Sequence, residues 1–246
     1  MSQKQQRKQL LVTTGATVTF TKLIELILHP TFLQLISSKL QYTHLVIQYG
    51  TSSDSQQLVE KLLSQIPQIS NKKISFKPDG ATTQTLTFPV TTTTTTKTSQ
   101  TKSTSQQSTQ SRLEIKCILF DTNLVANYTS KSHLVISHAG TGSILDTLRC
   151  PGVRLLVVIN SKLLDNHQLD IAEAFANMGV LKFHVPFDDD IEKKIDWQGG
   201  KKVDDVERES FSDFLKLVED VDDCEFKKIE PAKGSVIEDV ILSECN

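Results

Sequence analysis

The sequence predicts an α/β protein in which a parallel sheet is covered by helices on both faces. Short apolar runs rich in β-branched residues alternate with stretches whose apolar residues recur every three or four positions. Most of the short runs end at glycine or proline, as strands do where the chain turns. Strand–helix units repeated in one order favour parallel strands, because each helix returns the chain to the same end of the sheet.

The first part of the chain supplies two strands and three helical stretches. Residues 20–28 have the apolar spacing of an amphipathic helix, and Pro30 separates them from a second helical stretch. The elements expected here are strands at 10–14 and 44–48 and helices at 20–28, 32–40 and 58–66.

The second part continues the alternation. Residues 155–159 form a continuous apolar run, which is typical of a central parallel strand buried on both faces. Ser143, with Asp146 three residues later, fits the start of a helix as its N-cap. The elements expected here are strands at 115–120, 133–137, 154–159 and 181–185 and helices at 124–128, 143–148 and 167–178.

One folded domain, residues 10–186, is expected between a polar segment at 1–9 and an acidic C-terminal region at 187–246. Residues 82–111 are dominated by Thr, Ser, Gln and Lys, with six consecutive threonines at 91–96. Such an insert holds little apolar area to offset the entropy lost on ordering. We therefore expect it to be a disordered surface loop.

Charge is unevenly distributed along the chain. The net charge is −2, but residues 1–186 carry 18 Lys and Arg against 10 Asp and Glu, whereas residues 187–246 carry 9 against 19. A basic body suits an anionic small ligand, and an acidic end suits a protein partner or simple solvation. Nucleic acid is not favoured as a partner, because no basic run is interleaved with aromatic residues and only 6% of the residues are aromatic.

The spacing of the cysteines and the length of the apolar runs argue against a zinc-binding, a disulfide-rich and a membrane-spanning protein. The 4 cysteines form no CxxC pair, so free thiols are expected rather than a zinc knuckle or a disulfide framework. No apolar run approaches the ~20 residues of a membrane span, and residues 1–9 lack the apolar block of a signal peptide. These features predict a cytosolic protein whose membrane contact is peripheral. The carboxylates at 188–190 are interpreted as a solvated turn rather than a metal site.

Ligands of parallel α/β sheets bind beyond the carboxyl ends of the strands, which selects the loops at 14–20, 138–143 and 160–167. In the second loop, Gly140 and Gly142 allow close backbone approach, and the following helix start offers unpaired N–H groups that suit a phosphate. The spacing fits neither a full GxGxxG motif nor a P-loop. The pattern alone therefore leaves an ordinary strand–helix turn open.

The other two loops carry weaker patterns. Gly15 and Thr17 lie in a small, hydroxyl-rich loop that suits either a second anion contact or a tight turn. Asn166, His167 and Gln168 lie at the start of a helix, where their side chains would bind sugar hydroxyls or simply cap the helix.

The acidic end contains two apolar stripes. A helix is expected after Ser210. A short amphipathic segment beyond it either docks on the body or docks on another chain; its apolar residues are Val236, Ile237, Val240 and Ile241.

Taken together, these motifs resemble a known family. The runs SHAGTGS at 137–143 and DNHQ at 165–168, joined by the apolar strand that ends at Asn160, are very similar to the soluble, donor-binding subunit of the two-subunit UDP-N-acetylglucosamine transferase of dolichol-linked oligosaccharide synthesis. The runs TGAT at 14–17 and HLVIQYG at 44–50 fit as well. The resemblance covers roughly residues 10–185 apart from the insert.

This resemblance implies a Rossmann-like domain of glycosyltransferase family 28 type, forming the C-terminal half of a GT-B fold. A membrane-anchored partner would supply the other half, with the C-terminal helix of this chain docked on it. Together they would add the second, β1,4-linked GlcNAc to GlcNAc-diphospho-dolichol on the cytosolic face of the endoplasmic reticulum, and the chain alone would be inactive. The alternative is a non-catalytic module that binds a nucleotide sugar and serves assembly.

The resemblance also assigns site residues by position. Asp146 would reach the ribose of UDP-GlcNAc, where the family usually has the longer Glu. The catalytic base would come from the partner or the interface, with His138 as a fallback. Neither a metal nor another cofactor is expected, because N–H donors at a helix start can stabilise the leaving diphosphate. The diphosphate would contact Gly15, Thr17, Gly140, Thr141, Gly142 and Ser143, and the GlcNAc hydroxyls would contact Asn166, His167 and Gln168.

Overall fold

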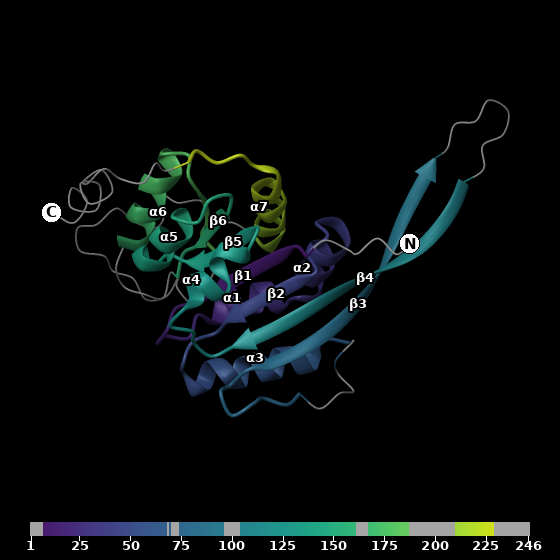
Figure 1. The fold of residues 1–246 in the computed structure, drawn as a ribbon, viewed down its shortest axis with the longest axis horizontal. Helices are drawn as coiled ribbons and strands as arrows, with labels where there is room; N and C mark the ends of the chain where they lie inside the picture. The colour runs from purple at the N-terminus through teal and green to yellow at the C-terminus, as the bar shows by residue number, and fades with distance from the viewer. Residues whose placement is uncertain are drawn as a thin grey trace.

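A seven-stranded sheet with the order β3-β4-β2-β1-β5-β6-β7 runs through the part of the chain that this computed structural model describes (Figure 1). The described residues are 7–67, 69, 74–95, 104–160, 167–186 and 210–228. Every described strand pair is parallel except β3 with β4, which is antiparallel. The predicted α/β architecture with a parallel sheet is confirmed.

Apart from β3, which was not predicted, the elements follow the predicted order. The strands are β1 (Gln9–Thr13), β2 (His44–Gln48), β3 (Thr82–Thr95), β4 (Thr104–Ile118), β5 (Leu134–His138), β6 (Arg154–Val158) and β7 (Lys182–His184). The helices are α1 (Thr21–Leu28), α2 (Pro30–Gln34), the π-helical turn η1 (Leu35–Lys39), α3 (Ser53–Gln65), α4 (Leu124–Asn127), the 3-10 turn η2 (Thr129–Lys131), α5 (Thr141–Leu148), α6 (His167–Asn177) and α7 (Phe211–Asp223).

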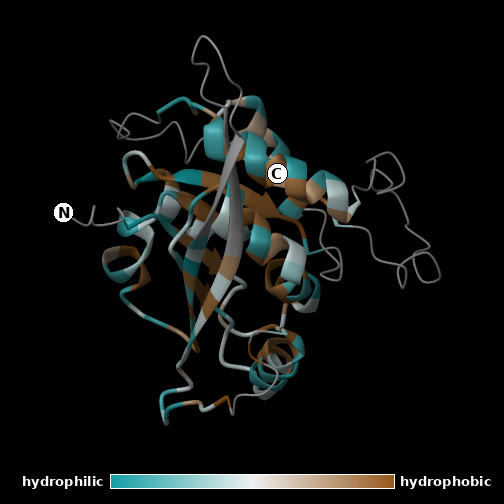
Figure 2. Ribbon diagram, turned by 90° about the vertical axis from the view of Figure 1, so that its right-hand side faces the viewer, coloured by the Kyte–Doolittle hydropathy of each residue, from teal (hydrophilic) through white to brown (hydrophobic). Residues whose placement is uncertain are grey.

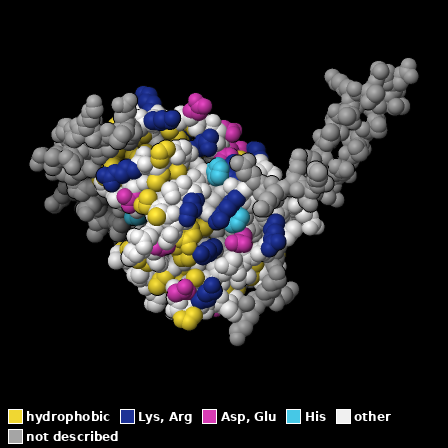
Figure 3. All heavy atoms as spheres, viewed as in Figure 1, with side chains coloured by type: hydrophobic (Ala, Val, Ile, Leu, Met, Phe, Trp, Pro, Cys, Tyr) yellow, Lys and Arg dark blue, Asp and Glu magenta, His cyan; other side chains and the backbone are white. Residues whose placement is uncertain are grey.

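Two apolar cores lie on opposite faces of the sheet. Successive residues of β1 point to opposite sides, so Leu10 and Val12 join one core while Leu11 joins the other. Helices α1, α2, α3 and α7 cover the first face, and α4, α5 and α6 cover the second. Figure 2 shows the apolar strands lying between these helices, whereas the outer face drawn in Figure 3 carries charged side chains of both signs. Burial on both faces explains why the strands are continuous apolar runs rather than alternating ones.

The strand order reverses between β1 and β5. From β1 the chain adds β2 and β4 on one side, and then crosses over to add β5, β6 and β7 on the other. In sheets of this topology the diverging loops leave a crevice at the reversal, beyond the carboxyl ends of the two strands. The fold therefore points to the loops after β1 and β5 as the place for a ligand.

The prediction of a disordered insert at 82–111 was wrong for its described part. β3 and β4 pair over their whole length as a hairpin, from Thr82 opposite Cys117 to Thr95 opposite Thr104 (Figure 1). Threonine is β-branched and favours extended backbone, and Leu86, Phe88 and Leu113 anchor the inner part of the hairpin in the first core. Residues 96–103 lie outside the described residues.

Helix α7 extends the domain beyond the predicted boundary at 186. Phe214, Val218 and Val221 are fully buried in the first core, and the Phe214 ring stacks on Phe32 with 5.7 Å between centroids. Ser210 begins the helix, as predicted, with a capping box to Asp213. The apolar segment at 236–241 lies outside the described residues.

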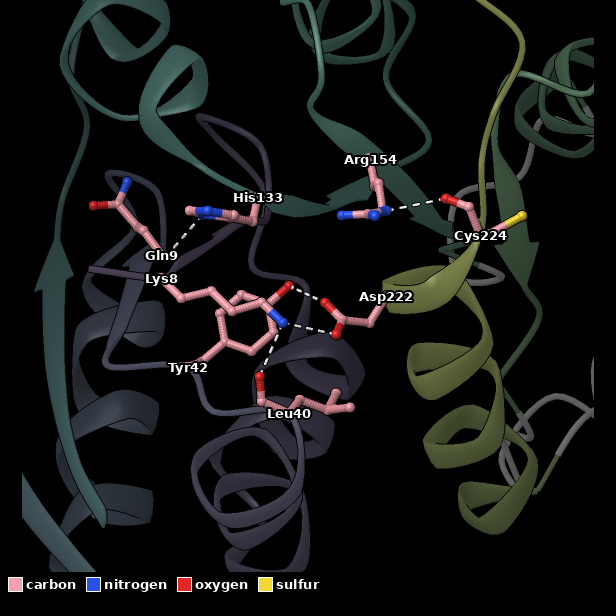
Figure 4. Close-up of polar contacts among 8 residues, drawn as sticks. All are labelled: Lys8, Gln9, Leu40, Tyr42, His133, Arg154, Asp222 and Cys224. Carbon is pink, nitrogen blue, oxygen red and sulfur yellow. Dashed lines mark hydrogen bonds and ion pairs between the residues drawn. The ribbon is translucent and has the colours of Figure 1, made fainter. Parts of the chain in front are cut away.

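Lys8 and Asp222 fasten the end of α7 to the start of β1. The Lys8 ammonium lies 2.7 Å from the Asp222 carboxylate and donates to the Leu40 carbonyl at 2.9 Å, while the Tyr42 hydroxyl donates to the same carboxylate at 2.6 Å (Figure 4). This cluster lies at the amino edge of the sheet, opposite the edge where the strand order places a ligand.

Two further features can be compared with the prediction. None of the described helices combines the length and apolarity needed to cross a membrane. The three cysteines within the described residues, Cys117, Cys150 and Cys224, are free thiols, as predicted.

Candidate functional site

The loops after β1 and β5 meet across the ring of His138, the last residue of β5. Gly15 has a positive φ of 92°, and a Cβ atom built on it would lie 3.3 Å from Nε2 of His138. A Cβ atom built on Gly140 would overlap the same imidazole. Glycine at both positions therefore lets the two loops approach each other with only the His138 ring between them.

The loop after β1 is held in shape by the loop after β2. The Thr14 N–H donates to the Gln48 carbonyl at 3.1 Å, and both the N–H and the hydroxyl of Thr51 donate to the Ala16 carbonyl, at 2.8 and 2.9 Å. These bonds fix the backbone around Gly15. Thr17, one residue beyond Ala16, is exposed to solvent.

Helix α5 begins two residues earlier than predicted. Its N-cap is Gly140, with no side-chain cap, so the assignment of Ser143 as N-cap was wrong. The first turn contains Thr141, Gly142 and Ser143 and no acidic residue. The orphan N–H groups of this turn are therefore not occupied by a capping side chain or by a carboxylate of the same turn. A Cβ atom built on Gly142 meets nothing within 4 Å, which leaves open space beside these N–H groups.

The His138 imidazole is partly buried between the two glycine loops. Burial lowers its pKa, and a hydrogen bond with the Thr13 backbone offsets this shift only in part. Its Nδ1 atom is buried and makes no hydrogen bond to the described residues. A ring wedged between two glycine loops is suited to setting the distance between them.

The residues assigned to the ribose and the sugar are described only in part. Asp146 lies one turn into α5, about half exposed at 52%, with Arg149 3.9 Å away. The side chain of Gln168 accepts a hydrogen bond from the N–H of Asn160 at 3.3 Å, which holds it at the carboxyl end of β6. Asn166 and the side chain of His167 lie outside the described residues.

Phe120 is a site candidate that the sequence interpretation missed. β4 ends at Ile118, two residues before the predicted strand end, so Phe120 lies in a loop and is 47% exposed. The loop is ordered by Asp121, whose N–H donates to the Gln48 side chain at 3.3 Å and whose carboxylate accepts from the N–H of Asn123 at 2.8 Å. An exposed aromatic ring at the carboxyl edge of the sheet is suited to stacking on a planar ligand group.

Comparisons with known proteins identify the family of this chain. Residues 77–197 match the glycosyltransferase family 28 C-terminal domain. The UDP-N-acetylglucosamine transferase subunit ALG13 of Saccharomyces cerevisiae is 35% identical over 178 residues, which cover 71% of this chain and 76% of the yeast protein. This chain belongs to the ALG13 family of UDP-N-acetylglucosamine transferase subunits.

Other members of the ALG13 family show the same relationship. The subunit of Candida albicans is 28% identical over 244 residues, covering 96% of this chain and 74% of that protein. The subunit of Cryptococcus neoformans is 34% identical over 187 residues, covering 76% and 80%. An NMR solution structure of ALG13 is 28% identical, covers 74% of this chain and 80% of that chain, and superposes with a TM-score of 0.47.

Proposed function

We propose that this chain is the UDP-GlcNAc-binding subunit of a heteromeric β1,4-N-acetylglucosaminyltransferase. The reaction would add the second GlcNAc to GlcNAc-diphospho-dolichol on the cytosolic face of the endoplasmic reticulum, during synthesis of the N-glycan precursor. Family membership supports a UDP-N-acetylglucosamine transferase subunit. The observation that carries the proposal is the pair of glycine loops that meet at the reversal of strand order.

The diphosphate of the donor would lie across these loops. Thr141, Gly142 and Ser143 would offer the N–H groups of the first turn of α5, and Gly15 and Thr17 would line the other side. When the glycosidic bond breaks, negative charge grows on the β-phosphate. Preorganised N–H donors and the positive end of a helix stabilise that charge without reorganising, so they lower the barrier.

The nucleoside and the sugar would occupy the flanks of this diphosphate site. We assign the ribose hydroxyls to Asp146 and the uracil ring to Phe120, whose exposed face is free to stack. The GlcNAc hydroxyls would be bound by Asn166, His167 and Gln168. Gln168 is held beside Asn160 at the carboxyl end of β6, which supports its place in this group.

The acceptor would be held by a second, membrane-anchored subunit. Among the described residues no carboxylate is hydrogen-bonded to His138, and its ring is wedged between the two glycine loops. We therefore assign deprotonation of the acceptor hydroxyl to the partner or to the interface between the subunits. The partner would be bound through the C-terminal segment that includes Val236, Ile237, Val240 and Ile241, and this contact would bring the chain to the membrane.

Reconstitution tests this proposal. The purified chain alone should transfer no GlcNAc to a lipid-linked GlcNAc-diphosphate acceptor, whereas the chain co-expressed with its membrane-anchored partner should. Deleting residues 236–246 should remove both membrane recruitment and transfer. Robust transfer by the lone chain would contradict the half-enzyme assignment, and donor binding with no activity in any complex would identify an assembly module instead.

A further inference from the structure

A cavity of about 340 Å³ lies at the amino edge of the sheet, far from the glycine loops. It is lined by Arg7, Thr43, His44, Arg112 and Glu114. The donor site proposed above uses none of these residues. The proposed donor site therefore does not account for this cavity.

Three segments of the sheet form the walls. Arg7 precedes β1, Thr43 and His44 begin β2, and His44 lies opposite Glu114 of β4. The Lys8 N–H donates to the Thr43 hydroxyl at 3.1 Å, and the Glu114 N–H donates to the Thr43 carbonyl at 2.9 Å. These bonds join Lys8 and Glu114 to Thr43, so the fold brings together the three segments that line the cavity.

The cavity carries uncompensated positive charge. Neither Arg7 nor Arg112 forms an ion pair with the described residues, and the Arg7 guanidinium donates to the neutral side chain of Gln9 at 2.9 Å. The one carboxylate in the lining is Glu114, so the lining holds two arginines and a single acid.

Neighbouring charges do not cancel this excess. The Asp222 carboxylate is already paired with Lys8, the residue after Arg7, so it does not neutralise the two arginines. The charge of Arg7 also acts on His44. The pKa of His44 is lowered first by burial and then by Arg7, whereas Glu114 has a smaller effect in the opposite direction. The Nδ1 atom of His44 is held 2.8 Å from the Thr43 hydroxyl.

We propose that this cavity binds a phosphomonoester group. Guanidinium forks match the oxygens of a phosphate and bind it through paired, charge-assisted hydrogen bonds. The volume exceeds that of a phosphate ion, so it accommodates the phosphate together with a small polar group. A phosphate of this kind is carried either by a soluble metabolite or by the headgroup of an anionic lipid, and the two sources differ in the experiment that detects them.

The probes are glycerol 3-phosphate in solution and phosphatidylcholine vesicles that contain phosphatidic acid. The full chain should bind glycerol 3-phosphate with amide NMR shifts at Thr43, His44 and Glu114. The double variant Arg7→Gln/Arg112→Gln should weaken this binding at least about tenfold, because it removes both charged donors. Both arginines are exposed, so the variant should fold normally, which thermal unfolding checks.

A charge-matched variant supplies the control. Lys61→Gln/Lys77→Gln removes two positive charges at other exposed positions and should leave binding unchanged. Co-sedimentation with the vesicles that is lost in the arginine variant would identify the lipid as a source, and binding of glycerol 3-phosphate without vesicle binding would identify a soluble ligand. Absence of glycerol 3-phosphate binding, or equal loss in both double variants, would overturn the proposal. UDP-GlcNAc binding should be the same in all variants, so failure here is distinguishable from failure of the proposed function.

Discussion

The side chains of Lys8 and Asp222 form a salt bridge of 2.7 Å, although the two residues are 214 positions apart in the sequence. The Asp222 side chain is 7% exposed, and its other oxygen accepts the Tyr42 hydroxyl at 2.6 Å. The Tyr42 pKa is raised, first by burial and then by this hydrogen bond. These contacts join the acidic end of the chain to the first strand, so α7 is part of the domain.

Asp222→Ala should lower the free energy of unfolding by about 2–3 kcal/mol, because it leaves the buried Tyr42 hydroxyl and a partly buried ammonium without their acceptor. Chemical denaturation measures this change. Asp220→Ala is the control on the same helix, since Asp220 is 66% exposed and lies 3.9 Å from Lys182. It should change stability by no more than about 0.5 kcal/mol. Equal losses in the two variants would show that the cluster does not fasten α7.

Gly142→Asp should weaken UDP-GlcNAc binding at least about 100-fold. The variant places a carboxylate in the open space beside the first turn of α5, where a diphosphate would lie, and like charges ~4 Å apart repel by several kcal/mol. Calorimetry of the assembled complex measures the affinity.

Two further substitutions at the same position separate charge from size. Gly142→Asn adds a neutral side chain of similar volume, and Gly142→Ala adds a methyl group that meets nothing within 4 Å. Both should bind the donor much better than Gly142→Asp. Unchanged affinity in Gly142→Asp would remove the diphosphate from this helix start.

Stability should fall as the pH drops below about 6.5. The pKa values of His44, His133 and His138 all lie below their ordinary value of 6.5 in the folded chain, chiefly because of burial. The unfolded chain therefore binds more protons in this range, so the stability that these residues contribute is complete above pH 6.5 and is lost as the pH falls towards the folded pKa values.

Denaturant titrations at about pH 7.5 and about pH 5.5 measure this dependence. A free energy of unfolding that stays level or rises on acidification would contradict the lowered pKa values of these three partly buried histidines.

Phe120→Ala should weaken UDP and UDP-GlcNAc binding by about tenfold, because one base–aromatic stack is worth ~1–3 kcal/mol. Thermal stability should change little, since the ring is 47% exposed. Val125→Ala, at a neighbouring apolar position that is 37% exposed, should bind the donor normally. If the two variants bind alike, the uracil ring does not stack on Phe120.

Much of the fold could be predicted from local patterns. β1, β5 and β6 are buried on both faces, so their continuous apolar runs are visible in the sequence. The hairpin of β3 and β4 could not be predicted in the same way. Its threonines are polar, and their ordering depends on pairing between strands that are joined through an intervening segment and anchored by Phe88 and Leu113.

Only part of the candidate site could be predicted, because some of its contacts depend on which strands become neighbours. Gly15 and Gly140 follow strand ends and could be identified from the sequence, but the contact of both with His138 depends on β1 and β5 becoming neighbours. Ser143 looked like an N-cap because its side chain suits that role, yet the helix begins without a side-chain cap at Gly140. Phe120 was assigned to a strand because the exact end of β4 is set by pairing with β2.

Mapping the donor by amide NMR shifts tests the central claim most directly. Titrating UDP-GlcNAc into the isotopically labelled chain, within the assembled complex, should shift the amides of Gly15, Gly140, Thr141, Gly142 and Ser143 first and most. Shifts confined to the amino edge around Thr43 and Glu114, or no shifts at donor concentrations that support transfer, would contradict the placement of the nucleotide sugar between the two glycine loops.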